Sequence, residues 1–160
     1  MTATPAEDIV YMRMALDEAR KAAECGEVPI GAVLVIDEKI LSCGRNQREN
    51  WQDPTAHAEM IALRAAAAEL QTWRLLHATL YVTMEPCAMC IGAVILARVK
   101  RLVFGVHDPK AGACGSIFNI PEERRLNHRL DVSSGVLEVE SKELLQQFFR
   151  TLRNRPVEAG

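Results

Sequence analysis

The sequence predicts an α/β fold in which a mixed sheet carries helices on both faces. Helical and strand patterns alternate along the chain. Residues 79–106 read as strand, helix and strand, which implies a parallel crossover pair. Residues 31–43 read as two strands joined by a short turn, which implies an antiparallel hairpin. The chain has 160 residues, a common size for one domain, so we expect a single domain over residues 1–160.

The composition is that of an ordinary globular protein, with 49% hydrophobic and 25% charged residues. No apolar run has the length of a membrane span, and the first residues lack the basic-then-apolar pattern of a signal peptide. We therefore expect a cytoplasmic protein with no membrane partner. The five cysteines are an odd number, which argues against a disulfide framework.

The net charge of −2 gives no overall indication of nucleic-acid binding. Basic residues nevertheless gather between residues 98 and 110 and again near the end of the last predicted helix. Such clusters are usually only solvated surface, so composition alone does not decide between idle charge and an RNA contact.

Apolar residues at helical spacing predict a first helix that ends near Gly26. Residues 31–36 are apolar on both faces, as in a central strand, and residues 40–43 begin its hairpin partner. We expect the second helix to run from about Thr55 to Leu70, with Asp53 as its cap and Pro54 in its first turn. The apolar residues on which these two helices depend are Ile9, Met12, Leu16, Ala19 and Ala23, then Met60, Leu63, Ala67 and Leu70.

The second half of the chain continues the alternation. Residues 79–83 and 101–106 predict strands, and between them residues 87–97 predict a helix so apolar that it must be buried on most sides. Residues 108–130 predict a long surface loop with short helical pieces, and loops of that length are often functional. Residues 136–139 predict an edge strand. A final helix then carries an apolar stripe made of Leu144, Leu145, Phe148, Phe149 and Leu152.

Two short segments carry the chemistry: His57-Ala58-Glu59 and Pro86-Cys87-Ala88-Met89-Cys90. Cys87 and Cys90 are three residues apart, so in the first turn of a helix they project to one side. The positive end of the helix dipole favours their thiolate forms. With His57 at the start of another helix, one imidazole and two thiolates make a site for Zn²⁺.

Three protein ligands leave the fourth tetrahedral position open to water, whose pKa the metal lowers towards about 7. Glu59 lies two residues beyond the predicted ligand His57, where it can serve as an acid and base. A Cys-x-x-Cys pair alone could equally be redox-active or structural. A structural zinc site would need a fourth ligand, for which Cys114, His107 and His128 are candidates. The combined pattern H-x-E…P-C-x-x-C is the known signature of zinc nucleobase deaminases.

Beyond this signature, the sequence resembles the bacterial tRNA adenosine deaminase family along most of its length. The matching stretches are VPIGAVLV, GRN, DPTAHAE, TLYVTMEPCAMC, RLVFGVHDPKAGACGS, LNHR and LLQQFFR. The resemblance implies a cytidine-deaminase-like fold, a three-layer α/β/α sandwich with a mixed five-stranded sheet. It also implies a homodimer with one Zn²⁺ per subunit that converts the wobble adenosine of a tRNA anticodon stem-loop to inosine, with no DNA partner.

The resemblance also assigns roles residue by residue. His57, Cys87 and Cys90 match the zinc ligands, and Glu59 matches the proton shuttle. Residues that match substrate-binding positions are Asn46, Ala58 and Pro86 at the target nucleoside, Asp108 and Lys110 beside the anticodon nucleotides, and Phe149, Arg150 and Arg153 on the final helix. From the residues alone, Asn46 could be only a turn residue, a phenylalanine could be core, and the arginines could be idle surface.

Two other functions remain open at this stage. One is deamination of a free purine such as guanine at the same site, against which the basic clusters favour RNA. The other is a non-catalytic RNA-binding module stabilised by zinc, against which Glu59 argues, because a structural site needs no acid and base. Two features depart from the family pattern: the tail after Arg155 is short and not basic, and Cys114 occupies a loop position where we expect an inert residue.

Overall fold

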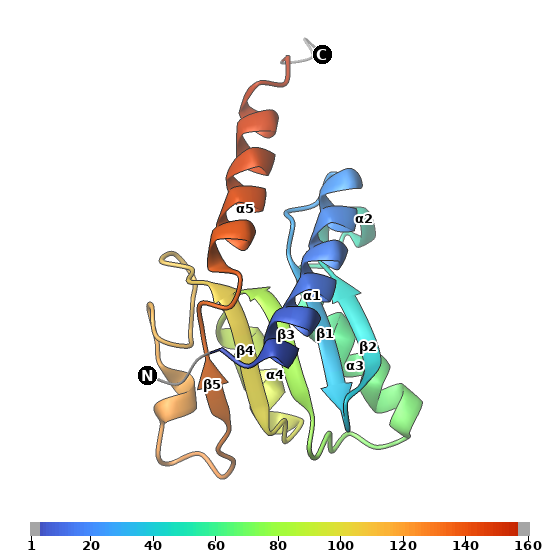
Figure 1. The fold of residues 1–160 in the computed structure, drawn as a ribbon, viewed down its shortest axis with the longest axis vertical. Helices are drawn as coiled ribbons and strands as arrows, with labels where there is room; N and C mark the ends of the chain where they lie inside the picture. Colours follow the sequence, from blue (N-terminus) through green and yellow to red (C-terminus); the bar gives the residue numbers. More distant parts are fainter. Residues whose placement is uncertain (1–3, 157–160) are drawn as a thin grey trace.

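A computed structural model describes residues 4–156, so the two ends of the predicted domain, residues 1–3 and 157–160, lie outside the described residues. At its centre is a five-stranded sheet in the order β2-β1-β3-β4-β5 (Figure 1). β1 pairs antiparallel with β2 and β3, whereas β3, β4 and β5 run parallel. The predicted mixed sheet, hairpin and crossover pair are therefore confirmed. The strands are β1 (Gly31–Ile36), β2 (Lys39–Arg45), β3 (Thr79–Met84), β4 (Arg101–Val106) and β5 (Asp131–Ser133).

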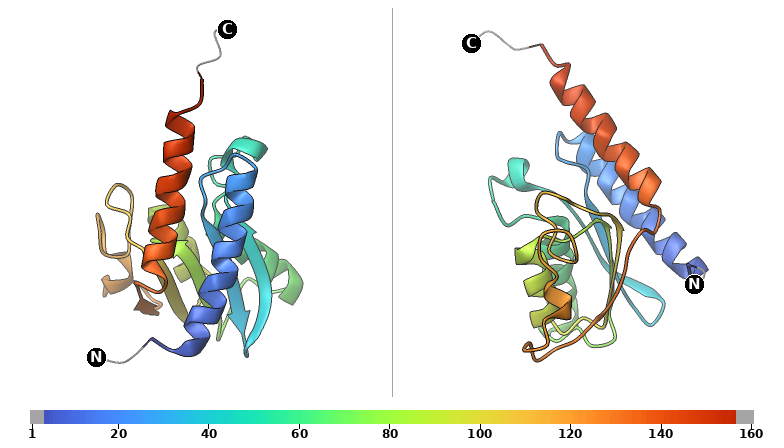
Figure 2. Two further views of the ribbon diagram at one scale, coloured as in Figure 1. Left: turned by 45° about the horizontal axis from the view of Figure 1, so that its top comes forward. Right: turned by 90° about the vertical axis from the view of Figure 1, so that its left-hand side faces the viewer.

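Helices cover both faces of this sheet. α1 (Ala6–Glu24) and α5 (Glu138–Arg153) lie side by side on one face, and α3 (Ala58–Leu70) and α4 (Ala88–Leu96) lie on the other (Figure 2). The three-layer sandwich predicted from the resemblance is confirmed. Over residues 4–156, no helix combines the length and the apolar character that crossing a bilayer would require.

The apolar core has two parts, one on each face of the sheet. The larger part joins the sheet to α3 and α4 and includes Leu34, Leu80 and Ile91, and the smaller part joins it to α1 through Met12 and Tyr81. Successive residues of a strand point to opposite faces, so the central strands contribute side chains to both parts of the core. This explains why residues 31–36 are apolar throughout, as the sequence predicted.

A buried polar cluster fixes α1 to the sheet. The carboxylate of Asp8 accepts two hydrogen bonds from the guanidinium of Arg101, at 2.7 and 2.6 Å, and one from the hydroxyl of Tyr81 at 2.9 Å. Asp8 is completely buried, and Arg101 is largely so. Arg101 therefore stabilises the fold, although it belongs to the basic cluster at residues 98–110 that the sequence analysis considered as a possible RNA contact.

The second long helix begins later than the sequence predicted. α3 starts at Ala58, not near Thr55, because the Asp53 carboxylate accepts hydrogen bonds from the amide and hydroxyl of Thr55, at 2.8 and 2.7 Å. These bonds close an Asx turn at the position where the prediction placed a helix cap. Before this turn, the short helix α2 (Arg48–Trp51) forms, which the sequence analysis missed.

The predicted edge strand at residues 136–139 was wrong. The edge strand is β5, where Asp131 to Ser133 pair with β4. Gly135 and Leu137 then take positive φ angles of 84° and 51°, which reverse the chain into α5. The predicted short helical piece in the 108–130 loop is confirmed as the 3₁₀ turn η1 (Ile120–Glu122).

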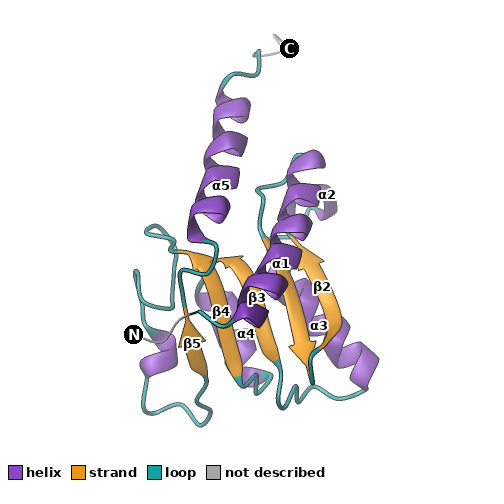
Figure 3. Cartoon of the chain, in the orientation of Figure 1, coloured by secondary structure: helices purple, strands orange, loops and turns teal. Residues whose placement is uncertain are grey.

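Three helices are less buried than their apolar patterns predicted. In α5 only Ser141 and Leu145 are buried, since the helix extends beyond the sheet (Figure 3) and leaves Phe149 43% exposed. In α4, Leu96 is 69% exposed because the helix packs by one face alone, and in α3 Leu70 is exposed at the last turn. Periodicity located these helices correctly but overstated how much of each the core covers.

Candidate active site

The predicted metal ligands meet at the starts of two helices. His57 occupies the position immediately before α3, Cys87 the position immediately before α4, and Cys90 the third residue of α4. Neither helix start has a side-chain hydrogen bond to its first amides. The positive ends of both helix dipoles therefore face the same point, where they favour thiolates.

The donor atoms of His57, Cys87 and Cys90 all lie within 4.8 Å of one another. The imidazole Nδ1 is 3.7 Å from the Cys87 sulfur and 3.4 Å from the Cys90 sulfur. Zinc bond lengths of about 2.1 Å to nitrogen and about 2.3 Å to sulfur in a tetrahedron place the two donors about 3.6 Å apart. The three side chains thus have the chemistry and the spacing of a tetrahedral zinc site, and the group could hold a metal ion.

Hydrogen bonds within this group separate the two thiols. A hydrogen bond from the Cys90 thiol lowers the pKa of Cys87 to about 3, and giving that bond raises the pKa of Cys90. The hydrogen bond between His57 and Cys87 raises the pKa of the imidazole. Bound metal would favour the deprotonated form of all three groups.

The candidates for a fourth protein ligand are held elsewhere. The Nδ1 atom of His107 lies 3.1 Å from the Glu85 carboxylate, and the Nε2 atom of His128 lies 2.6 Å from the Val99 carbonyl oxygen. Cys114 is buried, and burial raises the pKa of its thiol to about 12. Within residues 4–156, the group that could hold a metal consists of His57 and the two cysteines of α4. A three-ligand group leaves room for water or substrate, as catalytic zinc sites do.

Glu59 lies in the first turn of α3, two residues after His57, and is buried at 4% exposure. Burial raises the pKa of its carboxyl group. His57 and Glu59 both line a cavity of about 1080 Å³ that lies between the carboxyl ends of β3 and β4, the loop after β4 and α5. The buried carboxylate therefore faces the same space as the imidazole.

The cavity also gathers most of the predicted substrate residues. Asn46 and Ala58 line it, whereas Pro86 is buried and is not among the described residues that do. The Asn46 amide donates to the Val28 carbonyl at 3.3 Å and accepts from the Arg48 amide at 3.2 Å. Asn46 thus forms a turn and also lines the cavity, so the turn interpretation is confirmed and its contact with the target nucleoside stays a prediction.

The loop after β4 forms a second wall. Asp108 and Lys110 both line the cavity, and the Asp108 carboxylate accepts hydrogen bonds from the amides of Lys110 and Ala111, at 3.0 and 3.3 Å. Glu85, a buried carboxylate that the sequence analysis did not single out, lines the cavity as well. Burial raises the pKa of Glu85, but its hydrogen bonds, first among them that from Ser116, outweigh burial and lower the pKa below its usual range.

The third wall is α5, where Phe149, Arg150 and Arg153 all line the cavity. The Phe148 and Phe149 rings contact each other edge to face, with centroids 5.5 Å apart. The sequence analysis missed Lys142 and Gln146, which line the same wall. Their helical spacing from Phe149 could have revealed them. Among residues 4–156, five lysine and arginine side chains line the cavity: Arg48, Lys110, Lys142, Arg150 and Arg153.

Comparison with known proteins shows the family of this chain. The MafB19-like deaminase family model matches residues 6–153. A tRNA-specific adenosine deaminase of Bacillus subtilis is 53% identical over 149 residues, covering 93% of this chain and 92% of the relative. This chain belongs to the tRNA-specific adenosine deaminase family. A family member from Haemophilus influenzae is 52% identical over 91% of this chain and 85% of its own length.

Solved structures place the chain's fold among deaminases. A structure from a study of A-to-I editing by tRNA:A34 deaminases at the wobble position of transfer RNA is 46% identical. Its TM-score is 0.82, and the match covers 85% of this chain and 99% of the solved chain. A guanine deaminase from Nitrosomonas europaea has a TM-score of 0.74 at 24% identity, covering 92% of this chain and 86% of its own. At that identity the likeness is one of fold alone.

Proposed function

We propose that this chain catalyses hydrolytic deamination of the wobble adenosine in a tRNA anticodon, giving inosine and ammonia. The observation that carries the proposal is one cavity that contains His57, Cys87 and Glu59 and is lined by five basic side chains. A free base needs no such cationic wall, whereas RNA brings phosphates to it. The membership of the family supports the same substrate.

His57, Cys87 and Cys90 would hold one Zn²⁺ per subunit. When bound, zinc supplies a Lewis acid that makes water a nucleophile at neutral pH. The fit rests on the one-nitrogen, two-sulfur donor set and its spacing. We assign no ligand role to Cys114.

Glu59 would move the protons of the reaction. Its carboxylate takes a proton from the attacking water as the water oxygen bonds to C6 of adenine, and passes that proton to the neighbouring ring nitrogen. A second proton goes by way of Glu59 to the exocyclic amine, the bond between C6 and that nitrogen breaks, and ammonia leaves. Glu59 is almost completely buried at the start of α3, and this burial limits the access of bulk water to its carboxylate.

The remaining predicted residues would hold the RNA. A base must leave its stack to reach a buried site, and an anticodon loop presents splayed bases at little cost. Asn46 and Ala58, which line the cavity, would contact the target nucleoside, and Asp108 and Lys110 would meet its neighbours. On α5, Phe149 offers an exposed ring on which a base can stack, and Arg150 and Arg153 offer charge to phosphates.

We further propose that the chain acts as a cytoplasmic homodimer built from a single domain, with tRNA and not DNA as its nucleic-acid partner. Leu96, a large apolar side chain that is exposed at the end of α4, supports a partner on that face. The mass in solution from light scattering tests this: about twice 17.8 kDa is expected, and a monomer at micromolar concentration would contradict it.

A substrate comparison tests the function. Zinc-loaded protein is incubated with an adenosine-wobble anticodon stem-loop, the same RNA with adenosine moved into the stem, free adenosine and free guanine. We expect inosine only from the wobble adenosine. Ammonia from guanine alone would favour a free-purine deaminase, and binding of the stem-loop without any turnover would favour a non-catalytic module.

A further inference from the structure

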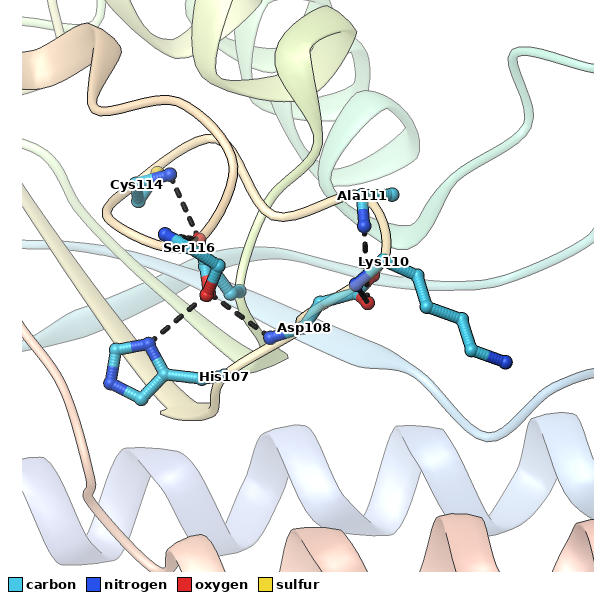
Figure 4. A network of polar contacts seen from close by, with 7 residues as sticks. His107, Asp108, Lys110, Ala111, Cys114 and Ser116 are labelled. Carbon is cyan, nitrogen blue, oxygen red and sulfur yellow. Dashed lines mark hydrogen bonds and ion pairs between the residues drawn. The ribbon is translucent and has the colours of Figure 1, made fainter.

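Glu85 follows β3 and is the acceptor at the centre of a network of hydrogen bonds that the proposed chemistry does not use. Its side chain is fully enclosed and accepts from the amides of Asp108, Cys114 and Ser116, at 3.0, 3.0 and 3.1 Å (Figure 4). It also accepts from the hydroxyl of Ser116, and the Nδ1 atom of His107 lies 3.1 Å away. All these partners belong to residues 107–116, hereafter the cavity loop.

The enclosed carboxylate is compensated by this one loop. Burying a carboxylate is costly unless hydrogen bonds replace its water. Here three backbone amides replace it, so the backbone of the cavity loop has to curl around the side chain of Glu85. A Cβ atom at Gly112 would collide with the same carboxylate, which shows how closely the loop backbone approaches it.

The same segment that carries Glu85 also carries the metal ligand Cys87. The Pro86 carbonyl accepts a hydrogen bond from the Ala113 amide at 2.9 Å, and Cys87 forms an isolated antiparallel bridge with Gly112. The Glu85 amide donates to the Val106 carbonyl at 2.8 Å. Main-chain bonds therefore tie residues 85–87 to Val106, just before the cavity loop, and to Gly112 and Ala113 within it, and the Glu85 side chain binds the loop between these points.

At the other end of the loop, these ties reach the cavity itself. The Asp108 amide is held by Glu85, and the Asp108 carboxylate in turn holds the amides of Lys110 and Ala111. Lys110 is exposed and lines the cavity. A continuous chain of hydrogen bonds thus runs from the segment of the metal ligands to the loop wall that faces the substrate.

We propose that Glu85 is a positioning residue for RNA, which fixes Asp108 and through it the cavity loop, so that Lys110 meets the anticodon nucleotides in register with the metal site. This inference rests on the proposed function, since it assigns an RNA-binding role to the loop. Glu85 also lines the cavity, but its carboxylate oxygens already accept hydrogen bonds from the cavity loop. In this scheme it therefore acts through the main chain of residues 107–116.

The main test is Glu85→Gln, which keeps the shape of the side chain but turns an amide NH₂ group towards donors. At least one loop amide then loses its acceptor. We expect KM for an adenosine-wobble stem-loop to rise by roughly tenfold or more, with kcat changed by less than about threefold and zinc content unchanged. The matched control is Asp8→Asn, which also removes a buried carboxylate but on the α1 face of the sheet; it should lower thermal stability and leave KM unchanged.

A double-mutant cycle separates positioning from general loss of structure. If Glu85 acts through Lys110, then Glu85→Gln should raise KM by less than about threefold in a Lys110→Ala background, because the contact that it positions is already gone. Independent, multiplying effects of the two substitutions would overturn the proposal. So would an unchanged KM in Glu85→Gln, or an equal rise of KM in Asp8→Asn.

Should Glu85→Gln fail to fold, Ser116→Ala removes one donor and leaves the carboxylate in place. It should raise KM in the same direction, by roughly two- to fivefold, again with little effect in the Lys110→Ala background. A folded Ser116→Ala protein with wild-type KM would overturn the proposal. Failure of the proposed function looks different: wild-type protein would then make no inosine from the stem-loop at all, which would also remove the basis of this inference.

Discussion

Removing the two arginines that α5 brings to the cavity should weaken RNA binding in a salt-dependent way. The perturbation is the double substitution of Arg150→Ala with Arg153→Ala. Both side chains line the cavity, together with three further basic residues. Each phosphate contact to single-stranded nucleic acid contributes about −0.7 to the slope of log K against log salt concentration. If all five basic residues contact phosphates, the slope is about −3.5, and loss of two leaves about −2.1.

These slopes translate into a large difference in measured affinity. Between about 50 and 200 mM salt the wild-type affinity should fall roughly 100-fold, and the affinity of the doubly substituted protein roughly 20-fold. The assay is fluorescence anisotropy of a labelled anticodon stem-loop, done in the Glu59→Gln background so that the RNA is not consumed. The control removes two exposed arginines of α1, Arg13 and Arg20, and so changes the net charge equally.

Identical slopes for the parent and the α5 variant would refute the assignment of α5 to RNA. A slope change of the same size in the α1 control would show that only net charge matters, and would refute it equally. The expected result is a shallower slope in the α5 variant alone.

Three further substitutions test the fold that holds the site. Asp8→Asn should reduce the free energy of unfolding by about 3 kcal/mol. This is at the low end for a broken buried ion pair, because Arg101 keeps some contact with water. A loss below about 1 kcal/mol in urea denaturation would contradict this. Burial, assisted by Asp8, raises the pKa of the Tyr81 phenol. Folding stability should therefore fall as pH rises past about 10, and it should fall less in Tyr81→Phe. Equal losses of stability in the two proteins between pH 9 and 11 would contradict this. In Gly44→Ala the new Cβ would collide with the Ala58 carbonyl and push α3 away from β2, so the amount of zinc bound per chain should drop. Full zinc content at wild-type stability would show that α3 does not set the position of His57.

The sequence was sufficient for the fold class and for the metal-binding group because these depend on local patterns. Short apolar runs predict the central strands, and the spacing of Cys87 and Cys90 places both thiols in one helical turn. His57 needed only a helix start nearby, and the error of three residues in that start left the ligand group intact, since the imidazole still precedes the first turn of α3.

What the sequence could not give depends on contacts between distant segments. Glu85 is separated from its partners by 22 to 31 residues, and nothing beside it in the chain marks it as buried. The exposure of Phe149 and Leu96 follows from where α5 and α4 extend beyond their neighbours, which periodicity does not report. The strand at 131–133 competed with a more apolar segment at 136–139, and pairing with β4 decided between them.

Inosine formation by zinc-loaded wild-type protein and by Glu59→Ala at equal zinc content tests the central claim most directly. The substrate is an adenosine-wobble stem-loop, and inosine is quantified by mass spectrometry under single-turnover conditions. The wild type should convert the RNA, and Glu59→Ala should bind metal and RNA normally but convert it at least about 100-fold more slowly. Comparable rates in the two proteins would contradict the assignment of proton transfer to Glu59. Loss of zinc together with activity in Glu59→Ala would show that the carboxylate serves the metal site and not the reaction.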